Sequence, residues 1–401
     1  MITILSISQN YHITGGSDGV FFRTNSILTE KGHTVIPFTA ASPKNLETPW
    51  SSYFPSAADF DHPNLKDIGM YIYSRNAAKA VEHLIKDHHI DIAHLHIYYG
   101  KLTASILEPL NKAGIPIIQT LHEYKLICPV YTLISNGRIC EACKGKNYIQ
   151  ALPRRCNRGS LSRTALSVAE SYVSRFAGSQ TKINHFIAVS NFTRDKMIEM
   201  GIASSKISTV YNPTEIFPET VNSEPGKYLL YFGRIERIKG IFTLLEAITS
   251  LKTIQVKIVG DGNGRGEMEE YIKNKNLDHV TYLGFRSGSE LVKLIKESLF
   301  VVLPSQWYEP FPLTILESFS HGKPVIGSNI GGITEQIVDG SDGFLVPPGD
   351  ALSLKEKILW MVDHPEQTRL MGQVGREKAS KLFNSEQYYQ SIMTIYNRLI
   401  G

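Results

Sequence analysis

Two carboxylates in the C-terminal half of the chain, Glu309 and Glu317, stand with seven residues between them. Four of the intervening residues are strongly apolar: Phe311, Leu313, Ile315 and Leu316. This pattern predicts a loop that enters a short helix packed on a core. We expect Glu309 at the mouth of a site and Glu317 two turns further along the same helix, within reach of a different part of one extended ligand.

The residues that follow predict a place for a phosphate. Residues 323–327 are typical of a short buried strand, and Gly331-Gly332 of a turn that opens another helix. Free backbone N–H groups and the helix dipole at such a turn point at an anion. Carboxylates beside a phosphate site suit an extended ligand such as a sugar nucleotide.

The stretch resembles the E-x7-E signature of the retaining glycosyltransferases of family 4, which have the GT-B fold. The match includes Gly331-Gly332-x-x-Glu335, the turn at 343–350, and upstream Phe232-Gly233-Arg234 with Lys239-Gly240, so it covers nearly the whole chain. Pro312 departs from the pattern, because many members carry glycine there. Proline has no N–H, so one backbone contact to the donor is missing.

The resemblance implies an α/β fold with two doubly wound, Rossmann-like domains that face a central cleft. We expect an N-terminal acceptor-side domain over 1–213 with a cysteine-rich insert at 128–156, and a nucleotide-sugar-binding domain over 214–384. A helix over 385–401 would cross back to the first domain. Residues 41–70 are expected to contribute to the acceptor side.

The resemblance also implies roles for individual residues. Arg234 and Lys239 would stabilise the departing diphosphate, so no metal is expected at the donor site. Glu309 would contact the transferred sugar and Glu317 the ribose, while His122 would orient the sugar. Further donor-binding candidates are Gly15, Gly16, Phe285, Arg286, Phe311, Leu313 and Thr314. Taken alone, two cations on a loop are more often surface charges, and a glycine loop such as 14–19 is more often a tight turn.

Three histidines lie near the ends of two expected strands, 90–96 and 115–122. Open α/β sheets bind ligands at the carboxyl ends of their strands. Packing explains His94 and His96 without a function, and we favour packing for His94. His122 ends its strand and matches the family's position beside the donor sugar, so we favour a functional role there.

All four cysteines of the chain fall in one 29-residue window, as Cys128, Cys140, Cys143 and Cys156. Two residues between Cys140 and Cys143 let both thiolates face one tetrahedral ion, as in zinc knuckles. A structural zinc or an iron–sulfur cluster is favoured over four unrelated thiols. A redox pair at Cys140 and Cys143 is the weaker alternative, since no helix N-terminus is evident there.

A basic stretch follows the cysteines: residues 144–182 hold eight Lys or Arg and one acid, Glu170. Interleaved apolar residues predict a basic amphipathic helix. A solvated charged face is the ordinary explanation, and contact with anionic lipid or a lipid-diphosphate acceptor is the functional one. Nucleic acid is disfavoured by the motifs downstream, and the net charge of +4 is too small to argue for it.

The composition is that of an ordinary soluble globular protein, which we expect in the cytoplasm; a peripheral place at the inner face of the membrane is the further expectation that the basic stretch raises. The N-terminal MITILSIS lacks the features of a signal peptide, and no apolar run approaches the ~20 residues of a spanning helix. We expect transfer of a sugar from a nucleotide diphosphate sugar to a hydroxyl of a glycan or lipid-linked saccharide, with retention, in cell-surface polysaccharide or glycolipid biosynthesis. A GT-B sugar-nucleotide epimerase and a non-catalytic binding module that uses the basic insert are the alternatives. The sequence leaves open the donor sugar, nucleotide, acceptor, linkage and oligomeric state.

Overall fold

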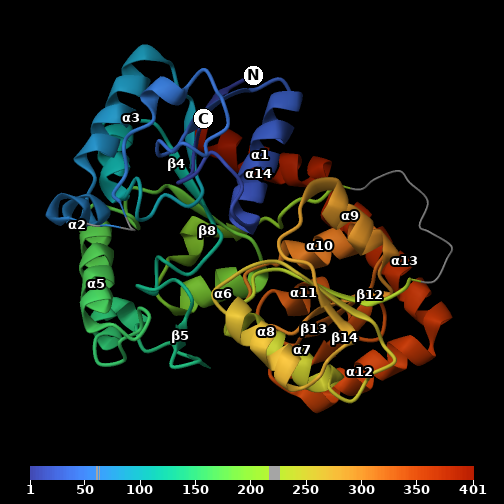
Figure 1. The fold of residues 1–401 in the computed structure, drawn as a ribbon. Coiled ribbons are helices and arrows are strands. Elements are labelled where there is room, and N and C mark those ends of the chain that lie inside the picture. The colour runs from blue at the N-terminus through green and yellow to red at the C-terminus, as the bar shows by residue number, and fades with distance from the viewer. Residues whose placement is uncertain (60–61, 63, 216–225) are drawn as a thin grey trace. The chain divides into compact units, whose positions relative to one another are not determined.

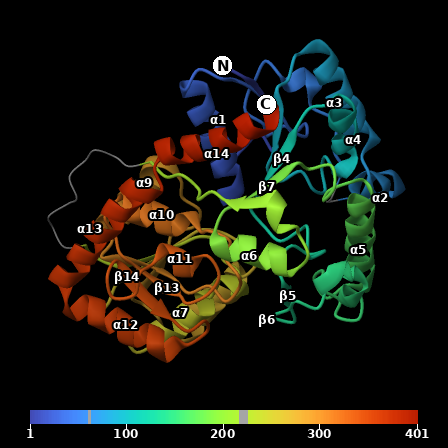
Figure 2. The same ribbon diagram turned by 180° about the vertical axis from the view of Figure 1, so that it is seen from behind.

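The computed structural model describes residues 1–59, 62, 64–215 and 226–401. The chain forms two compact units, one of residues 1–211 with 388–401 and one of residues 212–387. Each unit is a parallel sheet with helices on both faces (Figures 1 and 2). The linker expected at 214–227 falls largely outside the described residues.

The N-terminal unit is built on six parallel strands in the order β2-β1-β3-β4-β7-β8. The strands are β1 (Thr3–Ile7), β2 (Thr34–Phe38), β3 (Ile92–Leu95), β4 (Ile117–Leu121), β7 (His185–Ala188) and β8 (Ile207–Thr209). β3, β4 and β7 are buried along their whole length, as expected for a sheet covered on both faces. The last strand of this unit, β8, ends at Thr209.

Helices and a small hairpin complete this unit. They are α1 (Gly16–Glu30), α2 (Leu65–Ile72), α3 (Arg75–Asp87), α4 (Leu107–Lys112), α5 (Leu161–Phe176) and α6 (Asn191–Glu199), with the hairpin β5 (Ile134–Ser135) and β6 (Arg138–Ile139). Single-turn 3₁₀ helices occur at 51–53, 104–106, 144–146, 148–151 and 204–206. Short side chains begin several helices; at α6 the Ser190 hydroxyl accepts from the Thr193 N–H at 3.1 Å.

The C-terminal unit has its own six-stranded parallel sheet, ordered β11-β10-β9-β12-β13-β14. The strands are β9 (Leu229–Phe232), β10 (Val256–Val259), β11 (Val280–Tyr282), β12 (Phe300–Leu303), β13 (Val325–Ser328) and β14 (Gly343–Val346). The helices are α7 (Ile241–Ile248), α8 (Arg265–Asn274), α9 (Gly288–Glu297), α10 (Leu313–Ser320), α11 (Ile333–Gln336), α12 (Ala351–Asp363) and α13 (Pro365–Leu382), with a 3₁₀ turn at Arg237–Lys239. This strand order is that of the dinucleotide-binding fold.

The last helix, α14 (Ser385–Ile400), joins the N-terminal unit from Tyr388 onward. Its buried side chains Ile392 and Tyr396 pack in one cluster with Ile4 and Ile92 of the sheet. The Tyr396 hydroxyl also lies 2.6 Å from Nδ1 of His94. The final turns of the chain are thus part of the N-terminal core.

The helix expected in the basic stretch exists, but Val168 is its only buried apolar side chain. In α5 the buried positions are mostly Ser and Thr, while Leu161 and Phe176 are exposed at its two ends. Small hydroxyl side chains allow close packing, and Ser167 and Ser171 bond to carbonyls one turn earlier. No helix in the described ranges is both long and apolar enough to cross a membrane.

Candidate active site

The strand order places the expected site residues at the two points where ligands bind in open α/β sheets. The order reverses between β9 and β12 in the C-terminal sheet, and between β1 and β3 in the N-terminal sheet. Loops leaving adjacent strands in opposite directions open a crevice there. Lys239 follows β9 and Glu309 follows β12, whereas Gly15 follows β1 and His96 follows β3.

The turn after β9 brings Lys239 over the sheet edge. Gly240 adopts a left-handed φ of 75°, and a Cβ there would lie 1.7 Å from the carbonyl oxygen of Pro304. Only glycine fits such a close approach. The turn is therefore held against the segment after β12, which carries Glu309.

Lys239 and Glu309 meet across this turn although 70 residues separate them. Lys239 Nζ lies 2.7 Å from Glu309 Oε1, and the Ser305 hydroxyl donates to the same oxygen at 2.5 Å. The Lys239 ammonium also lies 4.8 Å from the ring centre of Trp307. Glu309 is 3% exposed, so its charge is compensated almost wholly by these neighbours.

Electrostatics keep this buried carboxyl ionised. Burial raises the pKa of Glu309, but the charge of Lys239 and the hydrogen bonds from Lys239 and Ser305 outweigh it, and the pKa is lowered overall. The site therefore holds a carboxylate and an ammonium together.

Arg234 does not join this pair. Its guanidinium forms an ion pair with Glu236 at 3.1 Å, and its side chain is 47% exposed. The structure places the two expected diphosphate-binding cations on one turn, with Lys239 engaged by Glu309 and Arg234 at the surface.

Glu317 lies on α10, but Glu309 does not, which corrects the expectation of one shared helix. The helix begins at Leu313, and Pro312 takes the extended conformation before it. The Gly331-Gly332 turn differs too: the Gly332 N–H donates to the Glu309 carbonyl at 2.7 Å, and α11 is a single turn. That turn therefore fixes the Glu309 backbone instead of offering this amide to a ligand.

The other donor-side candidates differ in how far their side chains are buried. Phe311 is 4% exposed and packs edge-on against Phe383, with ring centres 5.4 Å apart. Leu313 and Thr314 are half-buried at the start of α10, and the Thr314 hydroxyl reaches the Phe232 carbonyl at 3.4 Å. Phe285 is 64% exposed, and the following Arg286 bonds to its carbonyl and lies 3.6 Å from Glu290.

The three histidines of the N-terminal unit form a continuous group. His122 follows β4, and its Nε2 lies 2.9 Å from Nδ1 of His96, with the two rings at an interplanar angle of 12°. His96 in turn stacks on His94, with ring centres 4.6 Å apart. His94 is fully buried and bonded to Tyr396 and Thr120, as the packing interpretation predicts.

These imidazoles are neutral at pH 7. Burial lowers the pKa of His122 to about 4 and that of His94 to about 3, with His122 adding to the shift of His94. The pKa of His96 is also well below its usual value, chiefly through burial. A neutral His122 offers one N–H and one lone pair.

The glycine loop after β1 begins α1. Gly15 is the N-cap residue, in extended conformation, and no side chain caps the helix there. Gly15 and Gly16 are exposed, whereas Asp18 in the first turn is buried and accepts from the Thr14 N–H at 2.9 Å. Asn10 and Lys101, bonded at 2.8 Å, link this loop to the segment after β3.

The four cysteines all lie in the segment between β4 and α5. Cys128 and Cys143 are buried, Cys140 and Cys156 are half-buried, and none forms a disulfide. Within the described residues, no three or more His, Cys, Asp or Glu side chains are arranged as a set able to hold a metal ion.

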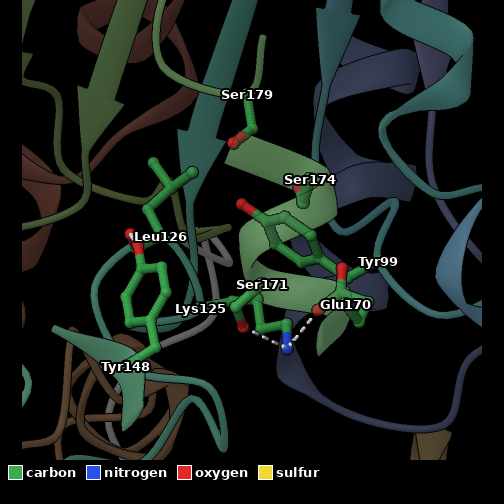
Figure 3. A pocket seen from close by; sticks show the side chains of 8 residues that line it. All are labelled: Tyr99, Lys125, Leu126, Tyr148, Glu170, Ser171, Ser174 and Ser179. Atoms are coloured by element: carbon green, nitrogen blue, oxygen red, sulfur yellow. Dashed lines mark hydrogen bonds and ion pairs between the residues drawn. The ribbon is translucent and has the colours of Figure 1, made fainter. Parts of the chain in front are cut away.

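A small polar pocket lies beside this segment (Figure 3). Its lining comprises Tyr99, Lys125, Leu126, Tyr148, Glu170, Ser171, Ser174 and Ser179. Lys125 points at Glu170 of α5, with Nζ 2.6 Å from Oε2, and both side chains are almost fully buried. The one acid of the basic stretch thus balances a buried lysine.

Sequence reasoning missed Ser305, Trp307 and the link from His96 to His122. Ser305 and Trp307 lie within four residues of Glu309 in the sequence, which was the one available signal. His96 carried a signal as well, since β3 and β4 were expected to end at one sheet edge.

Two doubly wound units, with an ammonium–carboxylate pair at a switch point of one and a histidine group at a strand end of the other, are the layout of GT-B transferases. The glycosyltransferase family 4 model matches residues 15–216, and the model of glycosyl transferases group 1 matches residues 212–378. The chain therefore belongs to glycosyltransferase family 4, and it is a sugar-transferring enzyme.

Individual relatives agree with this assignment. An uncharacterized glycosyltransferase of Methanocaldococcus jannaschii is 26% identical over 339 residues, which cover 84% of each chain. Sucrose-phosphate synthase from Thermosynechococcus elongatus shares the fold, with a TM-score of 0.75 at 20% identity over 100% of this chain and 99% of that one. Anabaena HepE in complex with UDP-glucose has a TM-score of 0.67 at 18% identity over 99% and 100%.

Proposed function

We propose that the protein moves a hexosyl or N-acetylhexosaminyl group from a nucleoside diphosphate sugar to a hydroxyl of a glycan or lipid-linked saccharide, with retention of the anomeric configuration. The product would enter cell-surface polysaccharide or glycolipid biosynthesis. The UDP-glucose bound by HepE supports a donor of this class. The epimerase alternative is not favoured by relatives that transfer sugars.

The buried pair of Lys239 and Glu309 carries the proposal. In retaining transfer the bond from the anomeric carbon to the diphosphate breaks, and negative charge grows on the leaving phosphate. A cation held in a nearly dry site stabilises that charge more than a solvated one. Lys239 is 14% exposed at its side chain and is fixed by Glu309, so it is already oriented before the donor binds.

Glu309 then has two tasks. It holds Lys239, and its second oxygen Oε2 is assigned to hydroxyl groups of the transferred sugar. Arg234 would turn from Glu236 towards the diphosphate, since an exposed arginine exchanges partners at little cost. Glu317 on α10 is assigned to the ribose hydroxyls. The positive charges on this turn take the place of a divalent cation.

His122 is the contribution of the N-terminal unit to transfer. Its neutral ring can donate a hydrogen bond to a sugar hydroxyl or accept one without adding charge beside a cationic transition state. The hydrogen bond with His96 leaves Nδ1 of His122 as the nitrogen available to substrate. Gly15 and Gly16, at the uncapped start of α1, would lie beside the phosphates.

The acceptor side would include the exposed surface around α5. Ile149, Leu161 and Phe176 are more than half exposed, and Arg155, Arg158 and Arg163 are exposed among them. Exposed apolar and cationic residues in one stretch of the sequence suit contact with the surface of an anionic membrane that carries a lipid-linked acceptor, reached from the cytoplasm. Flotation with vesicles that contain anionic lipid, compared with neutral vesicles, tests this contact.

The transfer itself is tested with a panel of UDP-, GDP- and ADP-sugars, alone and with candidate acceptors. We expect one donor to be consumed faster with an acceptor, and NMR of the product to show the anomeric configuration of the donor. Conversion of a donor to an isomeric nucleotide sugar without acceptor would identify an epimerase. Binding of no donor, with an intact fold, would favour the non-catalytic module.

A further inference from the structure

Trp307 is a large side chain buried beside the ion pair of Lys239 and Glu309. It lies on the segment after β12, two residues before Glu309, and it is 4% exposed. The Glu309 N–H donates to the Trp307 carbonyl at 2.8 Å, so a tight turn draws these two positions together. The bulkiest side chain of the segment is therefore held next to the buried charges.

The backbone before Trp307 is fixed to the turn that carries Lys239. The Gln306 N–H donates to the Ile238 carbonyl at 2.8 Å. The Gln306 side chain donates to the Thr243 hydroxyl of α7 at 2.7 Å. Because these bonds lie on either side of Lys239 in the sequence, the segment with Trp307 and the turn with Lys239 are joined through their backbones as well as through the ion pair.

The Lys239 ammonium lies over the face of the indole ring. Nζ is 4.8 Å from the ring centre, within the ~6 Å range of a cation–π contact. An ammonium has three N–H groups. One is directed at Glu309 Oε1, 2.7 Å away, and the ring covers a second side of the charge. Within the described residues Nζ forms no further hydrogen bond or ion pair, so one donor is left for an anionic ligand atom.

The indole N–H lies near the other member of the pair, the Glu309 carboxylate. Burial raises the pKa of Glu309, whereas Lys239 and Ser305 lower it, and the indole N–H adds to the lowering. The N–H is buried and has no acceptor at standard hydrogen-bond geometry. A buried indole N–H normally finds an acceptor, and the acceptor close to this one is the carboxylate assigned to the sugar.

We propose that Trp307 is a positioning residue for Lys239: its ring holds the ammonium so that the free N–H meets the diphosphate oxygen on which charge grows during transfer. This inference rests on the proposed function, because it takes Lys239 as the group that stabilises the leaving phosphate. A ring face attracts a cation without neutralising it, whereas a second carboxylate there would weaken the pull of Lys239 on phosphate. The ring also keeps water from that side of the ammonium, which preserves the effect of its charge.

Packing alone would also bury a tryptophan at this position. If packing is its whole role, any large apolar side chain should serve, and the electron density of the ring should not matter. A cation–π contact requires instead that transfer weakens as the ring becomes electron-poor. Fluorine atoms on the ring withdraw electron density with little change in size, so they separate the two explanations without removing the residue.

The first test uses the full chain, produced with tryptophan or with tryptophan that carries one, two or three ring fluorines. The kcat for donor consumption should fall stepwise, to about a tenth at three fluorines. The same series in Trp307→Phe should be flat, because the remaining Trp50 and Trp360 pack against His88 and His364. A flat series in the unaltered sequence would overturn the proposal.

Side-chain replacement gives a second readout. Trp307→Leu should lower kcat about tenfold and Trp307→Phe, which keeps a ring face, about threefold. Affinity for the free nucleoside diphosphate should change less than kcat, because the charge on the phosphate is greatest in the transition state. Trp360→Phe, a half-buried change in the same unit, is the matched control and should stay within about twofold. Equal kcat values for the two Trp307 variants would identify a packing role, and if Trp307→Leu does not fold, the fluorine series decides.

A third measurement needs no turnover, so it separates failure of this inference from failure of the proposed function. The chain has three tryptophans, and labelling with 5-fluorotryptophan allows the ¹⁹F resonance of Trp307 to be identified by its loss in Trp307→Phe. Lys239→Met should shift that resonance, whereas Arg237→Ala, on the same turn, should leave it in place. An unshifted resonance in Lys239→Met would overturn the contact and the proposal. A shifted resonance in a chain that consumes no donor would refute the proposed function, and the role of Trp307 with it, while the contact itself would stand.

Discussion

Lys239 Nζ lies 2.7 Å from Glu309 Oε1, and this ion pair joins the loops after β9 and β12 at the switch point of the C-terminal sheet. The pair links the residue assigned to the leaving group with the residue assigned to the sugar. Removing either partner leaves the other without its compensating charge in a nearly dry site. Both residues are therefore required for each other's placement.

Lys239→Met should lower kcat/KM at least about a hundredfold, because loss of one preorganised charge donor typically costs ~2.7–4 kcal/mol in the transition state. Arg234→Ala is expected to act in the same direction. The matched control is Arg237→Ala, on the same turn, where the side chain is 69% exposed and pairs with Glu267. Initial rates measured with saturating acceptor give kcat/KM for each variant. Near wild-type turnover in Lys239→Met, with the fold checked by circular dichroism, would refute the role of Lys239.

Glu317→Gln should mainly weaken nucleotide binding, and Glu309→Gln should mainly slow transfer. The reason is position: Glu317 lies on α10, whereas Glu309 lies before it and holds Lys239. Titration calorimetry with the free nucleoside diphosphate measures the first effect, and single-turnover rates measure the second. Unchanged nucleotide affinity in Glu317→Gln would remove its ribose role.

His96 is expected to act as a positioning residue for His122. His96→Phe keeps a flat ring of similar size but has no nitrogen opposite His122, so kcat should fall about tenfold with little change in KM. His96→Asn places a polar atom near the former Nδ1 and should recover most of the loss. If the Phe and Asn variants are equally slow and equally destabilised in urea, the role of His96 is packing alone.

The elements around these residues were largely predictable, because buried strands and the glycines that follow them are local patterns. The helix expected over 385–401 is α14, which begins at the expected residue, Ser385, and ends at Ile400. The pairing of Lys239 with Glu309 could not be predicted from the sequence. It depends on β9 and β12 being neighbours in the sheet, and hydrophobic periodicity does not give the order of the strands. The same holds for His96 and His122, which meet because β3 and β4 are adjacent.

In the basic stretch at 144–182 the helix was predicted, but the residues on its buried face were not. Its interleaved apolar residues predicted an amphipathic helix, but most of the buried positions of α5 carry small hydroxyl side chains, which allow close packing. Glu170 is the one acid of this stretch, and it is buried, because Lys125, 45 residues earlier, provides its counter-charge. Burial of a charged residue cannot be inferred until its partner is known.

The pair of Lys125 and Glu170 gives a stability prediction. Glu170→Gln should lower the free energy of unfolding by about 3–5 kcal/mol, because it leaves a buried ammonium unpaired. The double change Lys125→Met with Glu170→Leu should recover most of this loss. As a control, Lys86→Gln breaks an exposed pair with Glu82 and should cost less than about 0.5 kcal/mol. Urea unfolding followed by fluorescence measures all three, and a loss under 1 kcal/mol for Glu170→Gln would contradict the prediction.

His94, which contacts Tyr396 of α14, should make the stability of the N-terminal unit depend on pH. Burial lowers the pKa of His94 from 6.5 to about 3, so between these values the unfolded chain binds a proton that the folded chain does not. The stabilisation is complete above pH 6.5 and declines as the pH falls, by about 1.4 kcal/mol per pH unit for one such histidine.

His94→Gln should therefore flatten the dependence of unfolding free energy on pH between 6 and 4.5, even though it lowers stability at pH 7 through loss of the Tyr396 and Thr120 bonds. His89→Gln, at a side chain that is 83% exposed, should keep the wild-type slope. Equal slopes in the His94 variant and wild type would show that His94 is already protonated in the folded protein.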